Sequence, residues 1–286
     1  MRILLTGSKG QVGSALERAL APLGEVSAFD RQGLDLLDLN SLRTRMERER
    51  PDIIVNAAGY TAVDRAEQEK DLAFAVNSRA AGELAREAKS IDALLIHFST
   101  DYVFDGEKPA PYVETDAPNP LNVYGRSKLE GERAVAASGC RHFIFRASWV
   151  YAPVGRNFVN AILAAAKTRH ELRVVNDQHG APTSSVAIAA AVARLLADPG
   201  LPQKPGGIYH LSAAGETTWH GFAKEILSMK GLRTRITPIS SAEHGAPAPR
   251  PKNSLLDNAK LRAAFGIALP DWRLGLREVS SKIGFH

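Results

Sequence analysis

The sequence contains little cysteine and no long hydrophobic run. Cys140 is the only cysteine among 286 residues, which excludes an intramolecular disulfide and a cysteine-based zinc site. A membrane-spanning helix needs about 20 consecutive apolar residues, and no segment approaches that length. The apolar stretch that precedes Thr6 is too short for the core of a signal peptide. We therefore expect a cytoplasmic protein with no membrane contact.

The composition is that of an ordinary globular protein. Hydrophobic residues make up 44% of the chain and charged residues 23%, and we find no internal repeat or low-complexity tail. A chain of this length can bury a sizeable core without a disulfide or a metal. Collagen-like, disordered and coiled-coil proteins are therefore excluded.

The net charge is modestly positive. The chain carries 36 basic and 31 acidic residues, which gives +5. This charge could serve solubility alone, or it could indicate a partner that carries phosphate. We do not expect nucleic acid, because the basic residues are spread along the chain and the densest group, 43–50, includes acidic residues as a solvated helix face does.

Short apolar runs alternate with longer amphipathic segments through the first half. This alternation predicts a parallel sheet with helices on both faces, an α/β fold of the Rossmann-type doubly wound class. We assign residues 1–150 to an NAD(P)-binding domain. The predicted strands are 2–6, 25–29, 34–37, 53–55, 94–99 and 142–146, and the predicted helices are 11–23, 40–50, 71–89 and 124–137.

The second half is less regular. Residues 151–286 predict a smaller C-terminal α/β lobe that binds substrate, with some segments returning to the Rossmann core. Helices are expected over 157–168, 184–197 and 217–229, with a strand at 208–211 and a further helical stretch at the C-terminus. Proline-rich loops near 199–207 and 246–251 separate these elements.

Three glycines follow the first predicted strand. Gly7, Gly10 and Gly13 have the spacing Gly-x-x-Gly-x-x-Gly and stand directly before a helix. Residues without Cβ allow a tight turn and a close approach to a pyrophosphate, which the free N–H groups of the helix start can bind. A plain turn would use glycines too, but the position between strand and helix favours a dinucleotide site.

The end of the second predicted strand carries two opposite charges. Asp30 stands about 20 residues after the glycines, where an acidic side chain can hold the ribose hydroxyls of NAD. The adjacent Arg31 could instead pair with the extra phosphate of NADP. Both could also be ordinary surface residues, so the cofactor preference between NADPH and NADH stays open.

A Tyr-x-x-x-Lys spacing opens the predicted helix 124–137. Residues four apart share a helix face, so Lys128 is expected close to the phenol of Tyr124. The ammonium, the helix N-terminus and a bound nicotinamide cation would together lower the phenol pKa from its usual value of about 10 and prepare Tyr124 to protonate a carbonyl oxygen. Thr100, at the carboxyl end of a predicted strand, could hydrogen-bond the same oxygen, although Ser99-Thr100-Asp101 could also be strand-end turn chemistry.

These motifs together resemble the extended short-chain dehydrogenase/reductase family and, within it, the dTDP-4-dehydrorhamnose reductases. The resemblance extends over almost the whole chain in order. The segments that carry it are 6–13, 50–59, 60–64, 99–104, 120–128, 149–151, 176–183 and 250–254. Such reductases use NADPH or NADH to reduce the C4 ketone of dTDP-4-dehydro-β-L-rhamnose, which yields dTDP-β-L-rhamnose for cell-surface polysaccharide such as O-antigen.

The resemblance also implies roles for individual residues. The catalytic set would be Thr100, Tyr124 and Lys128. The cofactor would contact Gly7, Gly10, Gln11, Val12, Gly13, Asp30, Arg31, Asp38, Leu39, Ala57, Ala58, Tyr124 and Lys128. The dTDP-sugar would contact Thr100, Asp101, Tyr124 and Trp149. Mg²⁺ is possible by family resemblance, although the sequence shows no site for it.

Three residues of the second half suit a nucleotide-sugar. Asn157 and Arg250 offer donors for a diphosphate, and Trp149 offers a flat apolar wall. Trp149 could equally be core, Asn157 a helix cap and Arg250 a solvated loop residue. None of the eight histidines pairs at metal-binding spacing on one helix, so we expect no catalytic metal.

Other functions fit the same motifs. A related dTDP-hexulose reductase or a nucleotide-sugar epimerase would share the catalytic set and differ in the sugar pocket. A non-catalytic subunit resembling the regulatory β subunit of methionine adenosyltransferase would use the fold for binding only. The sequence leaves the oligomeric state open between monomer and homodimer.

Overall fold

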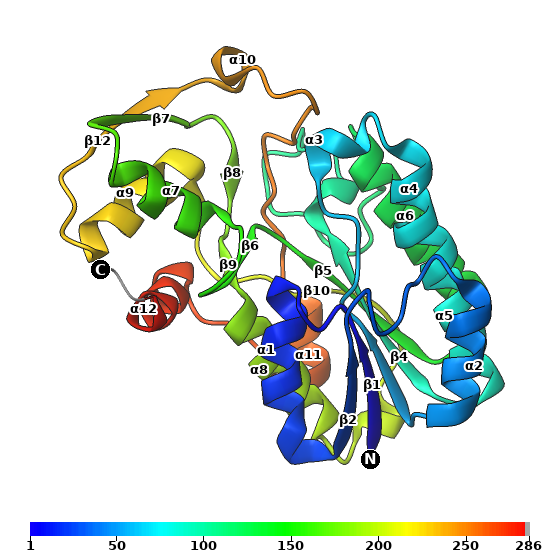
Figure 1. Ribbon diagram of the computed structural model, residues 1–286. Coiled ribbons are helices and arrows are strands. Elements are labelled where there is room, and N and C mark those ends of the chain that lie inside the picture. Colours follow the sequence, from blue (N-terminus) through cyan, green and yellow to red (C-terminus); the bar gives the residue numbers. More distant parts are fainter. Residues whose placement is uncertain (284–286) are drawn as a thin grey trace.

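A six-stranded parallel sheet lies at the centre of the computed structural model, which describes residues 1–283 (Figure 1). The spatial order is β10-β5-β4-β3-β1-β2. The strands are β1 (Arg2–Thr6), β2 (Glu25–Phe29), β3 (Ile53–Asn56), β4 (Leu94–Thr100), β5 (His142–Ala147) and β10 (Gly207–His210). Apolar side chains on both faces of β1, β3 and β4 are buried, as expected for a parallel sheet covered by helices. The predicted doubly wound α/β fold is confirmed.

The expected strand at 34–37 is wrong. This segment forms turns, and the sixth strand of the sheet is β10 instead, which pairs with β5. Leu34 and Leu36 are buried in the hydrophobic cluster under α2 (Leu39–Glu49), so their alternation imitates a strand. Helix α2 begins at Leu39, one residue before the predicted start at 40, because the Asp38 side chain accepts the N–H groups of Asn40 and Ser41.

Helices cover both faces of the sheet (Figure 1). One face carries α1 (Gln11–Leu20), α8 (Ser185–Leu196) and α11 (Ala259–Phe265), which share a single hydrophobic cluster with the strands. The other face carries α2, α5 (Ala80–Ser90) and α6 (Val123–Ala137). Because α8, β10 and α11 come from the second half, that half returns repeatedly to the sheet. Where one domain ends and the next begins stays a prediction.

The remaining second-half elements form a smaller lobe around its own cluster, which includes Phe222 and Trp272. Two short parallel strands pair in it, as do two antiparallel ones. Its helices are α7 (Phe158–Ala166), α9 (Trp219–Met229), α10 (Ser241–His244) and α12 (Trp272–Lys282), and its strands are β7 (Glu171–Val175), β8 (His179–Gly180), β11 (Thr217–Thr218) and β12 (Arg235–Ile239).

A short strand pair joins the sheet to the lobe, and short helical segments follow β3. β6 (Val150–Tyr151) pairs in parallel with β9 (Thr183–Ser184) directly after β5. The segment between β3 and α5 forms α3 (Val63–Ala66), α4 (Lys70–Phe74) and a π-helical turn (Ala75–Arg79). Within residues 1–283, no helix has both the length and the apolar character that a membrane span requires.

Candidate active site

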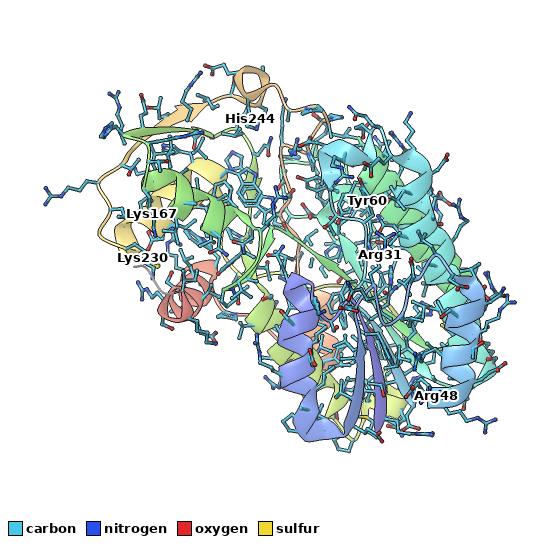
Figure 2. All side chains as sticks on the ribbon, in the orientation of Figure 1. Arg31, Arg48, Tyr60, Lys167, Lys230 and His244 are labelled. Carbon is cyan, nitrogen blue, oxygen red and sulfur yellow. The ribbon has the colours of Figure 1, made fainter. Side chains whose placement is uncertain are left out.

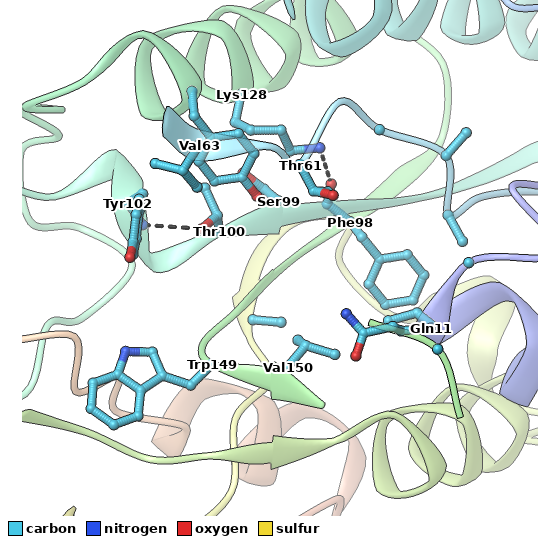
Figure 3. Close-up of a pocket in the computed structure, with 18 of the residues that line it drawn as sticks. Gln11, Thr61, Val63, Phe98, Ser99, Thr100, Tyr102, Lys128, Trp149 and Val150 are labelled. Carbon is cyan, nitrogen blue, oxygen red and sulfur yellow. Dashed lines mark hydrogen bonds between the residues drawn. The ribbon is translucent and has the colours of Figure 1, made fainter. Parts of the chain in front are cut away.

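A cavity of about 730 Å³ opens at the carboxyl edge of the sheet, between the strand ends and the lobe. Parallel sheets of this class bind ligands at this edge, and the volume lies within the range of small-molecule sites. Figure 3 shows Gln11 and Trp149 on the lower wall of the cavity, toward opposite ends, and Thr100 and Lys128 on the wall that faces them. The cavity therefore brings together residues that the sequence analysis singled out separately.

The glycine turn forms one end of this cavity. Gly7 has φ +70°, and a Cβ there would lie 2.6 Å from the backbone nitrogen of Ala58. A Cβ on Gly13 would lie 2.0 Å from the carbonyl oxygen of Gly7, so α1 can approach the turn only without a side chain. Gly10 caps α1 and lines the cavity together with Gln11 and Val12.

The side chain of Gln11 has a buried oxygen, Oε1, that lacks a hydrogen-bond partner among the described residues. A buried polar atom without a partner costs about 1–3 kcal/mol, so such atoms in a cavity indicate where a ligand donates a hydrogen bond. Ala57 and Ala58, after β3, line the same end. These residues fit the dinucleotide expected from the glycine spacing.

The acidic residue after β2 is already partnered. The Asp30 carboxylate pairs with Lys9 of the glycine turn and accepts the N–H groups of Gln32 and Gly33 at 3.0 Å. The hydrogen bond from Lys9 is the main cause that lowers the pKa of Asp30. Arg31 points elsewhere, because its side chain is 75% exposed and its Nε atom lies 3.7 Å from the Asp35 carboxylate. Lys9, which the sequence analysis passed over, is therefore the cation nearest this carboxylate.

Thr100 and Asp101 stand where β4 ends. The Thr100 hydroxyl accepts the N–H of Tyr102 and donates to the Asp101 carboxylate at 3.1 Å, so strand-end turn chemistry is present as well. Both side chains are buried and line the cavity. Burial raises the pKa of Asp101 to about 6, and its Oδ2 atom has no partner within the part of the chain described. This edge therefore offers a ligand one hydroxyl and one carboxyl group.

Tyr124 and Lys128 lie on the first two turns of α6. The helix starts here because the Asn122 side chain accepts the N–H of Gly125 at 2.8 Å. Burial raises the pKa of Tyr124 to about 12, although its hydrogen bond with Thr100 acts in the opposite direction. Burial therefore outweighs the neighbouring ammonium, and the lowering of the phenol pKa expected from a bound nicotinamide stays a prediction. At neutral pH the phenol keeps its proton and can donate it.

Lys128 is anchored to the sheet by a hydrogen bond. Its ammonium donates to the carbonyl oxygen of Phe98 on β4 (Figure 3), and no hydrogen bond from it to the Tyr124 phenol is found within residues 1–283. Burial lowers the pKa of Lys128 to about 8. Lys128 thus links the helix that carries Tyr124 to the strand that carries Thr100.

A π-helical turn supports α6 from behind. Asn77, within that turn, donates to the Ser127 hydroxyl at 2.9 Å and exchanges hydrogen bonds with the backbone of Tyr60. The close approach depends on Gly131, where a Cβ would lie 2.1 Å from the Asn77 carbonyl oxygen. Single π turns inside helices occur often at functional sites. No sequence pattern indicated this turn.

Aromatic rings from the lobe form the opposite wall. The indole of Trp149 stacks on Trp219 with ring centroids 3.7 Å apart and an angle of 10° between planes. Trp149 has φ +48°, a left-handed conformation that is strained for a residue with a side chain. The Trp219 indole N–H donates to the Gln178 side chain at 3.1 Å, and this hydrogen bond fixes the Trp219 ring. Trp219 lies 70 residues from Trp149 in sequence, and the sequence analysis missed it.

Eight of the residues expected to contact a ligand are not among those that line the cavity: Gly7, Gly13, Asp30, Arg31, Asp38, Leu39, Asn157 and Arg250. Asn157 caps α7 by accepting the N–H of Asn160. Arg250 pairs with Asp64 at 3.0 Å, while Asp38 caps α2 and Leu39 begins that helix. Their proposed ligand contacts stay predictions.

Few of the basic residues line the cavity. Figure 2 shows Arg31, Arg48 and Lys230 on widely separated parts of the molecule. Among the described residues, those that line the cavity and carry a positive charge are Lys9, Lys128 and Arg156. Arg156 precedes α7, and no ion pair or hydrogen bond of its side chain is found within residues 1–283. Most of the basic residues therefore lie away from the site.

Metal ligands do not gather in the described part of the chain. Residues 1–283 contain no group of three or more histidine, cysteine, aspartate or glutamate side chains arranged to hold an ion.

Comparison with known proteins gives a consistent result over the whole chain. Residues 1–284 match the family described as RmlD substrate binding domain. The dTDP-4-dehydrorhamnose reductase of Burkholderia thailandensis is 46% identical over 285 residues, covering 96% of either chain. The protein of the same name from Escherichia coli K12 is 41% identical over 293 residues, covering 99% of this chain and 98% of its own.

A solved structure agrees in fold as well. The crystal structure of dTDP-4-dehydrorhamnose reductase from Bacillus anthracis in complex with NADP has a TM-score of 0.93 to this chain at 36% identity. The match covers 98% of this chain and 99% of that one. The similarity therefore includes the sheet and the lobe alike.

Proposed function

Because the chain belongs to the RmlD substrate binding domain family, we propose that it reduces the C4 ketone of dTDP-4-dehydro-β-L-rhamnose to dTDP-β-L-rhamnose at the expense of NADPH or NADH. One observation carries this proposal. Thr100, Tyr124 and Lys128 meet on one wall of a cavity whose far end is the glycine turn. A proton donor and a dinucleotide site in one cavity are the parts that a ketoreductase needs.

The cofactor would lie along the glycine turn. Gly10, Gln11 and Val12 would hold its pyrophosphate at the start of α1, where free N–H groups favour phosphate. Ala57 and Ala58 would pack against it, and the unpartnered Gln11 side chain supports a ligand there. When bound, the nicotinamide supplies the hydride. The NADP in the Bacillus anthracis structure supports this use of the fold.

Tyr124 would protonate the sugar oxygen. Its phenol is buried beside Thr100 and has a pKa raised to about 12, so it remains protonated until a partner accepts the proton. The Thr100 hydroxyl would hydrogen-bond the same oxygen and hold the ketone in line. As the oxygen becomes alkoxide-like, its basicity exceeds that of a phenolate, and proton transfer becomes favourable.

Lys128 would stabilise the phenolate that remains on Tyr124. Its ammonium lies one helical turn away and is anchored to the Phe98 carbonyl. With a pKa of about 8, it is mostly charged at neutral pH. We therefore expect the reaction to slow as the pH rises through about 8, because the ammonium then loses its proton.

The sugar nucleotide would occupy the side of the lobe. Trp149 and Trp219 form a flat wall on which an apolar sugar face or a base can stack. The Asp101 carboxyl would meet sugar hydroxyls, and Arg156 is placed to meet a diphosphate. Asn157 and Arg250 stay candidate diphosphate donors, Arg250 only if its pair with Asp64 opens. The dTDP-sugar, the cytoplasmic location and the choice between monomer and homodimer remain predictions.

A stoichiometric assay tests the proposal. Purified protein, dTDP-4-dehydrorhamnose and either cofactor should show loss of nicotinamide absorbance equal to the product formed. A nucleotide-sugar epimerase, the second candidate from the same catalytic set, recycles its cofactor and would show no net loss. No turnover with either cofactor would refute a ketoreductase, and co-purification with a synthetase partner would then favour a regulatory subunit.

A single substitution tests the proton donor. Tyr124→Phe removes only the hydroxyl, and we expect kcat to fall about 10²- to 10⁴-fold while the Kd for NADPH stays unchanged. Turnover at the wild-type rate would remove Tyr124 from the mechanism.

A further inference from the structure

A buried ion pair lies directly behind the catalytic wall. Arg146 on β5 donates to Glu132 on α6 through two nitrogens, Nε at 2.9 Å and Nη2 at 2.6 Å. Both side chains are 2% exposed. The Arg146 guanidinium also lies over the ring of Phe104, 5.0 Å from its centroid. This geometry is bidentate, planar and fully enclosed.

Such a pair is a poor way to stabilise a core. Removing two charges from water costs several kcal/mol for each ion, and apolar residues of similar volume often stabilise a core as well or better. The pair therefore calls for a reason other than the free energy of folding. Its contacts with the neighbouring elements suggest that reason.

Glu132 reaches the catalytic strand directly. The Ser99 hydroxyl on β4 donates to Glu132 at 2.5 Å, and Ser99 is the residue before Thr100. One helical turn earlier on α6, Lys128 donates to the carbonyl of Phe98, the residue before Ser99. Two successive turns of α6 thus bind two successive residues of β4.

We propose that Glu132, held in place by Arg146, is a positioning residue for the reductase reaction proposed above: it fixes Thr100 against Tyr124 and supplies the negative charge behind the Lys128 ammonium. This role rests on the proposed function, because a residue can position catalytic groups only for a reaction. Misplacement of a reacting group by about 1 Å can cost a hundredfold in rate. A side chain that fixes both catalytic elements is therefore placed to affect kcat.

The charge of Glu132 also acts on Lys128. Glu132 raises the pKa of Lys128 against the effect of burial, which lowers it to about 8. The other titratable or charged groups near Lys128 come from α6, β4, β5 and the turn after β4, and they are Tyr124, His97, Asp101, Arg146 and Tyr102. His97 is held neutral, since burial and the Lys128 charge keep its pKa well below the usual value. Glu132 is therefore the group whose negative charge raises the pKa of Lys128.

Three variants of the full-length protein test the proposal. Glu132→Gln keeps the shape and removes the charge, Glu132→Asp restores the charge, and the double variant Glu132→Leu with Arg146→Met replaces the pair by apolar groups. Thermal unfolding, the Kd for NADPH, kcat and the pH profile of kcat/KM are measured for each of them. The wild-type protein is assayed alongside with dTDP-4-dehydrorhamnose.

Glu132→Gln should lower kcat about tenfold or more and move the basic limb of the pH profile down by about 0.5–1 unit. Glu132→Asp should return that limb to the wild-type position. The double variant should fold, bind NADPH with the wild-type Kd and still lose at least about tenfold in kcat. This last result separates positioning from stability, because the apolar pair removes the unpaired buried charge that destabilises the single variant.

Two results would overturn the proposal. One is a folded double variant with wild-type kcat. The other is a fall in kcat for Glu132→Gln that matches its unfolded fraction while the basic limb stays in place, which would assign the pair a structural role only. Failure of the proposed function is distinct, since the wild-type protein itself would then show no turnover.

Discussion

Substitutions of two glycines at the start of α1 should have different effects: one should lower stability and the other should weaken cofactor binding. Gly13 faces the Gly7 backbone, and an alanine Cβ there would lie 2.0 Å from the Gly7 carbonyl oxygen. Relief of that overlap requires α1 to move by about an ångström, and overpacking of this kind costs about 1–3 kcal/mol. The better helix propensity of alanine returns up to about 1 kcal/mol. We expect Gly13→Ala to lose about 2 kcal/mol.

Substitution of Gly10 should affect cofactor binding more than stability, in contrast to substitution of Gly13. The φ of −74° at Gly10 suits any residue, and a Cβ would lie 3.1 Å from the same oxygen, a contact that small shifts can relieve. The new methyl group would project toward the cavity, where the cofactor pyrophosphate is expected. Gly10→Ala should therefore keep its stability within about 1 kcal/mol. It should weaken NADPH binding about tenfold or more, which corresponds to about 1.4 kcal/mol.

Calorimetry measures the Tm of Gly13→Ala and Gly10→Ala, and fluorescence titration measures their affinity for NADPH. Each variant serves as the control for the other. A loss of 2 kcal/mol should lower the Tm of Gly13→Ala by about 3–4 °C. An unchanged Tm in that variant would contradict the packing account. Wild-type NADPH affinity in Gly10→Ala would contradict the placement of the pyrophosphate on this turn.

Three further perturbations have expected outcomes. Lys9→Ala leaves the Asp30 carboxylate without its cation, so the ratio of NADPH to NADH affinity should fall about tenfold in competitive titrations; an unchanged ratio would separate Lys9 from cofactor choice. Trp219→Leu removes the stack on Trp149, so the KM for the sugar nucleotide should rise about three- to tenfold with NADPH affinity unchanged, and a change confined to NADPH would refute the assignment of this wall. Burial lowers the pKa of His210 to about 3, so the unfolded chain takes up a proton below pH 6.5 that the folded chain does not. Stability in urea should therefore fall as the pH falls, by about 2 kcal/mol from this residue between pH 7 and pH 5, and His210→Gln should remove that part of the slope.

Local patterns predicted the first half of the molecule well. The strand, glycine turn and helix at residues 2–20 follow from hydrophobic periodicity and from the need for Gly7 and Gly13 to lack a side chain. The position of Thr100 follows from the rule that the carboxyl ends of parallel strands meet at the same edge, and the shared face of Tyr124 and Lys128 follows from their spacing of four residues on a helix. Those inferences need only nearby residues.

Long-range contacts account for most of what the sequence could not predict. Nothing in residues 207–210 indicates that they complete the sheet instead of 34–37, because pairing with β5 depends on the path of the whole second half. The partner of Arg250 depends in the same way on where its loop passes, because Asp64 is distant in sequence and occupies the guanidinium. The Trp149–Trp219 stack likewise joins segments that are distant in sequence.

The pKa of Tyr124 shows a second limit. A helix spacing of four residues predicts proximity to Lys128 but cannot reveal the burial that raises the phenol pKa. Nor can it reveal that the ammonium would find the Phe98 carbonyl as its hydrogen-bond partner. Electrostatic environment is a property of the assembled core, and single residue pairs predict it poorly.

Transfer of a labelled hydride tests the central claim most directly. NADPH carrying deuterium at C4 of the nicotinamide is mixed with dTDP-4-dehydrorhamnose and the wild-type protein, and the sugar product is examined by mass spectrometry and NMR. We predict one deuterium at C4 of the sugar for each cofactor oxidised, and almost none in the same time with Tyr124→Phe. Deuterium that stays on the cofactor, or equal transfer by Tyr124→Phe, would contradict the account.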